Sequence, residues 1–338
     1  MTIKIKNNRI VSQKEFPEDK KMDLNLRPRV LDDFIGQENL KTNLRIFIQA
    51  AKQRQEPLEH ALFHGGHGLG KTTISYIIAR EMGVNMQITS GPALEKIGDL
   101  AAILTSLEDG SILFIDECHR LNRAIEEVLY PAMEEYALDL VVGQGPSAKI
   151  LRLDLPKFTL IGATTRPSLV SPPLRDRFGA VYQLEFYKTP EIKEIIRRSA
   201  RILRIKISDR AAEEIALRAR FTPRVANRLL KRVRDFAQVH NQETISEKAA
   251  IEALEMMEID EKGLNQIDRR ILRALIEKFS GGPAGLKTLA VSIGEDLSTI
   301  EEIYEPYLIQ IGFLNRTPRG RTVTESAYRH LGYKKGLI

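Results

Sequence analysis

Hydrophobic and polar positions follow two alternating patterns in the first half of the chain. Short apolar runs bounded by polar residues predict strands at 60–64, 85–89, 111–115 and 158–162. Apolar positions that recur at helical spacing predict helices at 37–54, 72–82, 96–107 and 122–135. Strands that alternate with helices form a parallel sheet with right-handed crossovers. The pattern therefore predicts an α/β domain at 22–186.

From Thr189 onward the apolar positions follow a helical period only. They predict a small helical domain at 187–260, followed by a third block at 261–338. This block contains predicted helices and then two short apolar segments around a basic turn at 315–321. Helices followed by a basic hairpin indicate a winged-helix domain. Residues 1–21 are polar and rich in lysine, and we expect them to form a flexible arm.

The composition indicates more than one core and argues against several classes of protein. The chain has 338 residues, of which 43% are hydrophobic, whereas single cores usually stop growing at about 250–300 residues. Its one cysteine, Cys118, excludes a disulfide framework and a zinc site built mainly from thiolates. No apolar run reaches the roughly 18–20 residues that are needed to cross a bilayer. We therefore expect neither a membrane anchor nor secretion, and hence a cytoplasmic protein. The net charge of +6 is compatible with a polyanionic partner.

Residues 65–72 have the sequence Gly-Gly-His-Gly-Leu-Gly-Lys-Thr, which matches the phosphate-loop pattern GxxxxGKT between a predicted strand and a predicted helix. Glycines let backbone N–H groups turn inward around phosphate oxygens, and the start of a helix favours negative charge. Lys71 is expected to reach the terminal phosphates, and Thr72 to offer its hydroxyl to Mg²⁺. ATP and Mg²⁺ are thus the expected cofactors, with further contacts from Gly65, Gly68, Gly70 and Thr73.

Two acidic residues, Asp116 and Glu117, follow the predicted strand at 111–115. An acidic pair at a strand end is often structural, but downstream of a phosphate loop it indicates an ATPase. Asp116 is expected to hold Mg²⁺ through its water shell, and Glu117 to orient the attacking water or accept its proton. We assign no catalytic role to Cys118, because a buried cysteine is usually inert, or to His119, which is expected to form local hydrogen bonds.

Short segments spread over the chain from Leu26 onward carry a family resemblance. They are Leu26-Arg27-Pro28, Phe34-Ile35-Gly36-Gln37, the segment 116–121, Tyr130-Pro131-Ala132-Met133-Glu134-Glu135, the segment 158–166, Leu174-Arg175-Asp176-Arg177-Phe178-Gly179, the segment 222–228 and Tyr307-Leu308-Ile309-Gln310. With the phosphate loop, they make the chain similar to the AAA+ ATPases and, within them, to the RuvB family of Holliday-junction branch-migration motors. The resemblance implies a parallel-sheet AAA+ domain, a helical lid and a C-terminal winged helix.

The resemblance also implies roles in one subunit's own nucleotide pocket. Leu26, Arg27 and Ile35 look like adenine-side contacts, although without the resemblance Leu26 and Ile35 would be core residues. Thr165 resembles the sensor that hydrogen-bonds the γ-phosphate region or the lytic water. In the hinge and lid, two residues are expected to couple nucleotide state to domain movement, namely Tyr187 and Arg224.

Other residues are implied to act on a neighbouring subunit. Arg177 resembles the arginine finger that offsets charge on the transferred phosphoryl group, a role that requires an oligomer. By the same resemblance, three residues would lie near the adjoining subunit's nucleotide, namely Glu134, Glu135 and Tyr136. Ordinary ion pairs are the alternative for Arg175, Arg177 and Arg224. Half-buried packing is the alternative for Tyr136 and Tyr187.

The partners implied by the resemblance are duplex DNA, four-way junctions and RuvA, with RuvC as a candidate third component, around a homohexameric ring. Residues 138–155 look like a hairpin with an apolar face, which would dock RuvA or simply complete its own domain. The basic turn is suited to tracking phosphates without selecting a sequence, through Arg316, Arg319 and Arg321. A solvated terminal charge run is the alternative there.

The chain departs from the family pattern in two places. Gly66-His67 replaces Pro-Pro in the phosphate loop, and compatible exchanges of this kind change stability by roughly 0.4–1 kcal/mol each. We expect retained hydrolysis with weaker nucleotide affinity. Phe221 replaces a glycine before Thr222-Pro223-Arg224, which concerns the local geometry of the lid and not the identity of Arg224.

Two other functions share parts of this pattern. A clamp-loader or initiator ATPase has the same nucleotide residues but does not move continuously along DNA. A nucleotide-gated DNA-binding regulator would use the winged helix to recognise a sequence, with ATP switching its assembly. Processive junction unwinding separates the motor from the first, and a sequence-selective footprint on ordinary duplex would favour the second.

Overall fold

The computed structural model describes residues 11, 25–142 and 149–334. The predicted arm at 1–21, apart from Val11, and the hairpin turn at 143–146 lie outside this range. The described part of the chain forms two compact units, one at 23–186 and one from Tyr187 onward.

The first unit is built on a five-stranded sheet in the order β2-β3-β6-β1-β7, with every pairing parallel. The strands are β1 (Ala61–His64), β2 (Met86–Ser90), β3 (Ile112–Asp116), β6 (Thr159–Thr164) and β7 (Ala180–Gln183). The α/β prediction is confirmed, and the four predicted strands agree with the observed ones to within two residues at either end. The edge strand β7 was not predicted, because its half-exposed residues form no continuous apolar run.

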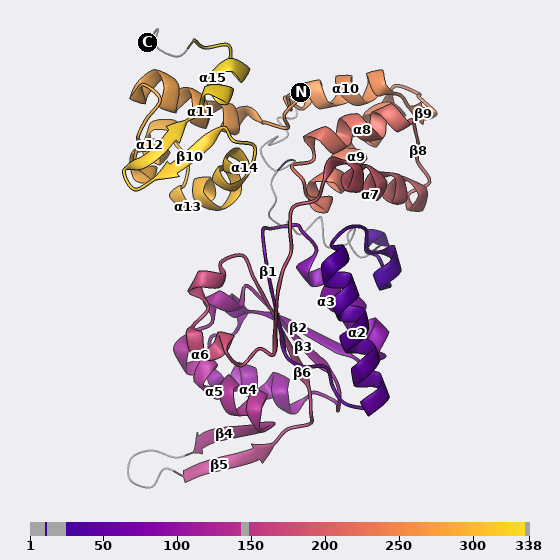
Figure 1. Cartoon of the computed structure of the whole chain (residues 1–338), viewed down its shortest axis with the longest axis vertical. Helices are drawn as coiled ribbons and strands as arrows, with labels where there is room; N and C mark the ends of the chain where they lie inside the picture. Colours follow the sequence, from indigo (N-terminus) through magenta and orange to yellow (C-terminus); the bar gives the residue numbers. More distant parts are fainter. Residues whose placement is uncertain (1–10, 12–24, 143–148, 335–338) are drawn as a thin grey trace. The chain divides into compact units, whose positions relative to one another are not determined.

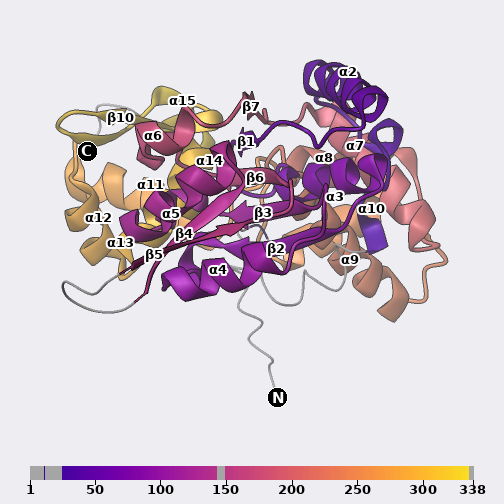
Figure 2. The same ribbon diagram turned by 90° about the horizontal axis from the view of Figure 1, so that it is seen from below.

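Helices cover both faces of this sheet, with α2 and α3 on one side and α4 and α5 on the other (Figures 1 and 2). The α-helices of this unit are α2 (Glu38–Arg54), α3 (Lys71–Met82), α4 (Ile97–Thr105), α5 (Arg123–Glu134) and α6 (Pro172–Arg175). Single 3-10 turns join them at Leu31–Asp33, Gly91–Ala93, Cys118–Arg120 and Pro167–Leu169. A hairpin of β4 (Ala137–Val142) and β5 (Lys149–Asp154) projects from this core (Figure 1).

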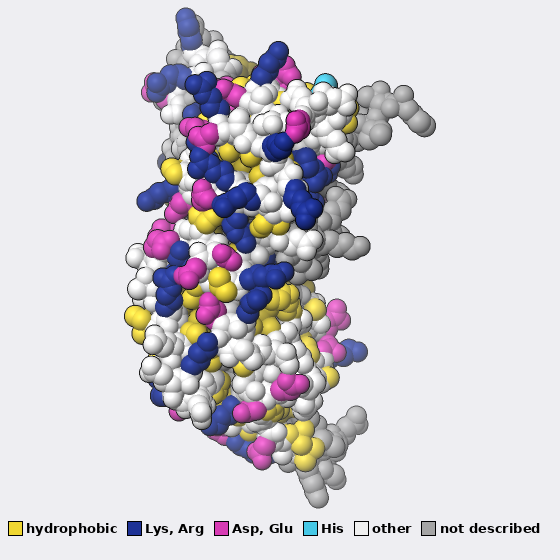
Figure 3. Space-filling view, turned by 90° about the vertical axis from the view of Figure 1, so that its right-hand side faces the viewer, with side chains coloured by type: hydrophobic (Ala, Val, Ile, Leu, Met, Phe, Trp, Pro, Cys, Tyr) yellow, Lys and Arg dark blue, Asp and Glu magenta, His cyan; other side chains and the backbone are white. Residues whose placement is uncertain are grey.

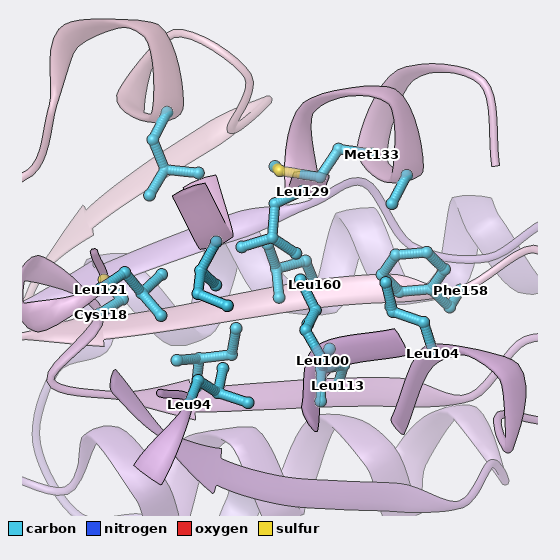
Figure 4. Packing of buried hydrophobic residues seen from close by; sticks show 14 of the residues in the cluster. Leu94, Leu100, Leu104, Leu113, Cys118, Leu121, Leu129, Met133, Phe158 and Leu160 are labelled. Carbon is cyan, nitrogen blue, oxygen red and sulfur yellow. The ribbon is translucent and has the colours of Figure 1, made fainter. Parts of the chain in front are cut away.

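The buried strand β3 shows how the sheet is held between the two helical layers. Leu113 and Ile115 belong to the cluster that packs under α4 and α5, together with Leu100 and Leu129 (Figure 4). Phe114 alternates with them, points to the other face of the sheet and is fully buried. A strand buried on both faces lies between two rows of helices, so its carboxyl end is firmly placed.

The second unit begins with a helical bundle and ends with a winged helix. The bundle contains α7 (Thr189–Ile202), α8 (Asp209–Arg218), α9 (Pro223–Val239) and α10 (Glu247–Met256), and two short strands, β8 (Lys206–Ile207) and β9 (Thr244–Ile245), which were not predicted. The winged helix contains α11 (Gln266–Phe279), α12 (Leu286–Ile293), α13 (Leu297–Thr299), a π-turn (Ile300–Tyr304), α14 (Glu305–Gln310), β10 (Leu314–Thr317), β11 (Gly320–Val323) and α15 (Glu325–His330).

A buried ion pair joins the bundle to the winged helix. Arg220, just after α8, pairs with Asp268 on α11, and both side chains are completely inaccessible to solvent. The Arg220 guanidinium also lies 4.8 Å from the ring centroid of Tyr307, whose hydroxyl donates to the Lys262 carbonyl at 2.6 Å. Burial raises the pKa of Asp268 while Arg220 opposes this shift. These contacts bring the helical bundle and the winged helix together in one compact unit.

Phe221 shows how the second departure from the family pattern is accommodated. Its φ is +56°, in the left-handed region that a glycine adopts freely and that costs other residues roughly 1–2 kcal/mol. Its ring packs against Tyr307 with centroids 6.0 Å apart, and its carbonyl accepts a hydrogen bond from the Tyr187 amide at 3.1 Å. Packing thus holds the left-handed turn before Arg224 without a glycine.

The surface carries both signs of charge. Figure 3 shows Lys and Arg side chains interspersed with Asp and Glu over one face. On the helical bundle, for example, Lys193 lies 2.8 Å from Asp209 and 2.9 Å from Glu213. Such pairs at the surface contribute little to stability. Among the described residues, none of the helices combines the length and the apolar character that a bilayer crossing requires.

Candidate active site

The predicted phosphate loop connects β1 to α3 at the carboxyl edge of the sheet. The ends of β1 and β6 are adjacent there, with His64 opposite Thr164, and β3 ends at Asp116 beside them. Ligands of open α/β sheets bind outside the carboxyl ends of the strands. The topology therefore gathers the loop, the acidic pair and the predicted sensor Thr165 at one edge.

Backbone geometry makes the loop a cradle for an anion. Gly65, Gly68 and Gly70 have φ values of +144°, +76° and +107°, which favour glycine. A Cβ atom on Gly65 would lie only 2.6 Å from the Leu184 carbonyl oxygen, so this position excludes any side chain. Lys71 donates to the Gly65 and Gly66 carbonyls at 2.8 and 2.9 Å, while Thr72 and Thr73 occupy the first turn of α3. The residues present therefore fit a bound triphosphate.

The acidic pair lies at the end of β3, where the chain turns sharply. Glu117 adopts a left-handed conformation with φ +49°, and its N–H donates to the Asp116 carboxylate at 3.0 Å. Uncommon backbone conformations of this kind concentrate at functional sites. Thr165 donates its hydroxyl to the Glu117 carboxylate at 3.1 Å, so the predicted sensor and the predicted water-orienting residue meet directly.

Two histidines flank Glu117, and neither was predicted to take part in catalysis. The Nδ1 atom of His119 lies 3.2 Å from one carboxylate oxygen, and the Nδ1 atom of His67 lies 3.7 Å from the other. His119 also lies 2.9 Å from the Thr164 hydroxyl. In the sequence, only its position inside the phosphate loop could have pointed to His67. The fold is what brings its side chain to the acidic pair.

The expected adenine-side residues lie beside α3. Leu26 is buried, Ile35 is half-buried, and the Arg27 guanidinium lies 5.0 Å from the ring centroid of Tyr76 on α3. Tyr76 was not predicted to take part, since an aromatic residue at helical spacing is usually a core residue. Because α3 follows the phosphate loop, the segment around Arg27 is placed along the same helix that begins at Lys71.

Comparison with known proteins agrees with this geometry. Family models for the Holliday junction DNA helicase RuvB P-loop domain, the RuvB AAA lid domain and the RuvB C-terminal winged helix domain match residues 26–184, 187–260 and 261–332. The chain is 59% identical to the Holliday junction branch migration complex subunit RuvB of Dehalococcoides mccartyi, over 96% of this chain and 93% of that protein. The chain belongs to the RuvB family. It is therefore a P-loop ATPase of the AAA+ class, as the resemblance implied.

Solved structures of RuvB have the same fold. The Thermotoga maritima RuvB Holliday junction branch migration motor is 52% identical, with a TM-score of 0.84 over 92% of this chain and 99% of that one. A point variant of the same Thermotoga protein gives a TM-score of 0.85 over 91% of this chain and 99% of that one. The predicted combination of a parallel-sheet P-loop domain, a lid and a winged helix is confirmed.

In this RuvB-family chain, Arg177 is held by residues of its own chain. Its guanidinium lies 4.2 Å from the ring centroid of Tyr130 and 3.1 Å from the Glu134 carboxylate, and it donates to the Pro173 carbonyl at 2.8 Å. Arg177 and Glu134 therefore share one surface, whereas Arg175 is half-exposed beside Asp176.

Glu135 and Tyr136 lie elsewhere on the RuvB P-loop domain. Glu135 pairs with Arg152 on β5. Tyr136 packs against His60 and Phe158, which precede β1 and β6, with ring centroids 6.5 and 5.9 Å away. Because those residues lie at the amino ends of the strands, Tyr136 is at the opposite edge of the sheet from its own phosphate loop. The nucleotide roles predicted for Glu134, Glu135 and Tyr136 concern a neighbouring subunit and stay predictions, as do those of Tyr187 and Arg224 in the other unit.

Arg321 is the predicted DNA contact whose surroundings differ most from the expectation. Its side chain is 11% exposed and forms a bidentate pair with the buried Glu305, with contacts of 3.2 and 2.9 Å. Arg316 and Arg319 are exposed on the wing. Arg321 therefore ties β11 to Glu305 on α14, and its contact with DNA stays a prediction, as do those of Arg316 and Arg319.

Cys118 is buried beside the end of β3, so the reactivity of its thiol reports whether solvent reaches this part of the site. Burial, with Glu117 and Asp116 nearby, raises the pKa of its thiol to about 12. A raised thiol pKa keeps the sulfur protonated, so the reactive thiolate at pH 8 is about 10³-fold scarcer than for an ordinary cysteine. We expect no reaction with Ellman's reagent in the native protein and full reaction in guanidinium chloride. Rapid modification of the native protein would show that this strand end is open.

Proposed function

We propose that the chain is an ATP-driven motor that translocates duplex DNA and drives branch migration of Holliday junctions. It works as a homohexameric ring that RuvA recruits to the four-way junction, with RuvC as a further component of the complex. The observation that carries the proposal is that all three RuvB domains are present and that the phosphate loop, the acidic pair and Thr165 lie at one sheet edge.

Water attacks the γ-phosphorus of ATP, the bond from this phosphorus to the bridging oxygen of the β-phosphate breaks, and ADP and inorganic phosphate leave. Glu117, held by the Thr165 hydroxyl, orients the water and accepts its proton. Lys71 leaves the loop carbonyls and contacts the terminal phosphates. Mg²⁺, held by Thr72 and Asp116, would offset phosphate charge when bound.

The helical bundle and the winged helix carry the movement to DNA. The buried pair of Arg220 and Asp268 joins them, so a displacement of the lid is passed to the wing. Tyr187, whose amide donates to the Phe221 carbonyl, begins this unit and serves as the hinge. Arg224 lies three residues after Phe221, in the first turn of α9, and we expect it to report on the γ-phosphate.

ATP-dependent dissociation of a synthetic four-way junction, measured with and without RuvA, tests this function. We expect dissociation that needs ATP, Mg²⁺ and RuvA and that stops when Lys71→Ala removes the phosphate-loop lysine. A sequence-selective footprint on linear duplex without junction dissociation would favour the regulator instead. ATP hydrolysis without processive unwinding would favour a clamp-loader.

The wing arginines give a prediction about DNA binding. Arg316→Ala combined with Arg319→Ala should lower the salt dependence of duplex binding by about two units of slope, since each phosphate contact contributes about 0.9. Binding titrations at several salt concentrations measure this slope. Arg321→Ala is the matched control, because it should lower stability through the buried Glu305 and leave the slope unchanged. An unchanged slope in the double variant would remove the wing from the mechanism.

The β4–β5 hairpin gives a prediction about RuvA. Val141 and Ile150 are directly paired in the ladder and so belong to the same face of the hairpin. Replacing both with aspartate should abolish capture of the chain by immobilised RuvA, because charge opposes an apolar contact. ATPase activity and the circular dichroism spectrum serve as controls. Undiminished capture with the fold intact would place the RuvA contact elsewhere.

A further inference from the structure

The Glu117 carboxylate has polar neighbours from three separate segments. Thr165, after β6, and His119, in the turn after β3, both face its Oε2 atom at 3.1 and 3.2 Å. His67, from the phosphate loop, faces the other oxygen, Oε1, with Nδ1 at 3.7 Å. The carboxylate is therefore approached from both sides, and the phosphate loop supplies one of them.

The chemistry of these groups determines how they interact. An ionised carboxylate only accepts hydrogen bonds, so a ring nitrogen that faces it stably must carry a proton. The distance from His67 to Oε1 exceeds a direct hydrogen bond but lies within the range of an electrostatic contact. The His67 and Glu117 side chains are 20% and 23% exposed, so solvent screens this contact less than it would at the surface.

His67 is part of the phosphate loop, so its contact with Glu117 links this loop to the acidic pair. The residues just before it, Gly65 and Gly66, lend their carbonyls to Lys71. His67 therefore lies within the loop that must rearrange when a triphosphate enters and Lys71 turns to it. A shift of this loop changes the surroundings of Glu117 directly, through one side chain.

We propose that His67 is a positioning residue for ATP hydrolysis, which draws the Glu117 carboxylate toward the phosphate loop and couples its orientation to occupancy of that loop. This inference rests on the proposed ATPase function. His67 acts through Glu117, which in turn orients the water, so its loss should affect the turnover rate more than nucleotide binding.

The contact itself can be tested without nucleotide. The chain has six histidines, so a protein labelled with ¹⁵N at its imidazole rings gives a small set of signals, and the His67 signal is the one missing from His67→Gln. We expect Glu117→Gln to shift the His67 signal in the nucleotide-free protein. Glu127→Gln, which changes an exposed carboxylate on α5, is the matched control and should leave it in place. An unmoved signal in Glu117→Gln would overturn the proposal.

Steady-state kinetics test the consequence. We expect His67→Ala to lower kcat about tenfold, less than the roughly 100-fold loss that a full misplacement of a reacting group causes, with KM and ADP affinity changed less than about twofold. His67→Gln keeps an N–H donor and should restore at least half of the rate. Equal losses in the alanine and glutamine variants, or an unchanged or higher kcat in His67→Ala, would overturn the positioning role.

The two experiments separate this inference from the proposed function. If the unmodified protein hydrolyses no ATP, the proposed function fails, whereas the ring signal still reports whether His67 and Glu117 are in contact. His240→Ala, just after α9 in the other unit, controls for nonspecific effects of removing a histidine.

Discussion

Replacing Arg177 with alanine is expected to lower the steady-state ATPase rate by about 10³-fold or more, because an arginine finger is worth about 10³–10⁵ in rate. The surroundings of Arg177, on the surface that it shares with Glu134, support this expectation. Stacking on Tyr130 and contacts with Glu134 and the Pro173 carbonyl hold the guanidinium in one direction before any partner arrives. Such preorganisation lowers the entropy lost when the finger enters a neighbouring pocket.

Arg175 provides a matched control for this experiment. Arg175→Ala changes a half-exposed arginine two residues away and should keep near-normal activity. Arg177→Lys should recover little, since a lysine lacks the planar fork that stacks and pairs at once. Mixing Arg177→Ala with Lys71→Ala subunits should restore part of the rate, because one variant retains an intact phosphate loop and the other an intact finger. Full activity of Arg177→Ala alone would contradict a shared pocket.

Replacing Arg220 with alanine is expected to lower the free energy of unfolding of the second unit by about 3–5 kcal/mol, as breaking a buried ion pair does. Asp268 would remain fully buried without its cation, and burial already raises the pKa of this carboxyl. Without Arg220 the side chain must take up a proton or stay charged in an apolar surrounding. Either outcome disfavours the native contact between α11 and the residues after α8.

Urea denaturation of the full chain, followed through its tyrosine signals, measures this loss. Lys206→Ala is the control, since it breaks an exposed pair with Glu243 and should cost less than about 0.5 kcal/mol. Replacing Arg220 and Asp268 together with apolar residues of similar size should recover much of the stability. If Arg220→Ala unfolds at the same urea concentration as the parent, the pair does not hold the two parts together.

Much of the nucleotide site could be predicted because its signals are local. The phosphate loop is one continuous stretch whose glycines and Lys71 act through their own backbone and the next helix. The strand β3 is apolar from Ile112 to Ile115 and ends at Asp116, with Glu117 next in the chain, and the parallel sheet brings this strand end to the loop. The edge strand β7 was missed for the opposite reason, since its residues alternate between partly exposed and exposed, and its pairing with β1 is the main evidence for it.

The roles of individual charged residues could not be predicted in the same way. Arg321 has the same side chain as its neighbours on the basic hairpin, but Glu305 on α14 pairs with it and Arg319 stays exposed. Phe221 looked like a change in lid geometry, yet Tyr307 supports the left-handed turn that a glycine would make. In both cases the deciding partner lies far away in the sequence.

By itself, then, the sequence determined the class of fold, the order of the domains and the chemistry of the phosphate loop, since periodicity and contiguous motifs are carried by neighbouring residues. Only the tertiary structure decided that His67 faces Glu117, that Arg177 rests on Tyr130 and that Arg220 joins the lid to the winged helix. Each of these contacts depends on the distance and burial of side chains from separate segments. Those quantities exist only once the chain has folded.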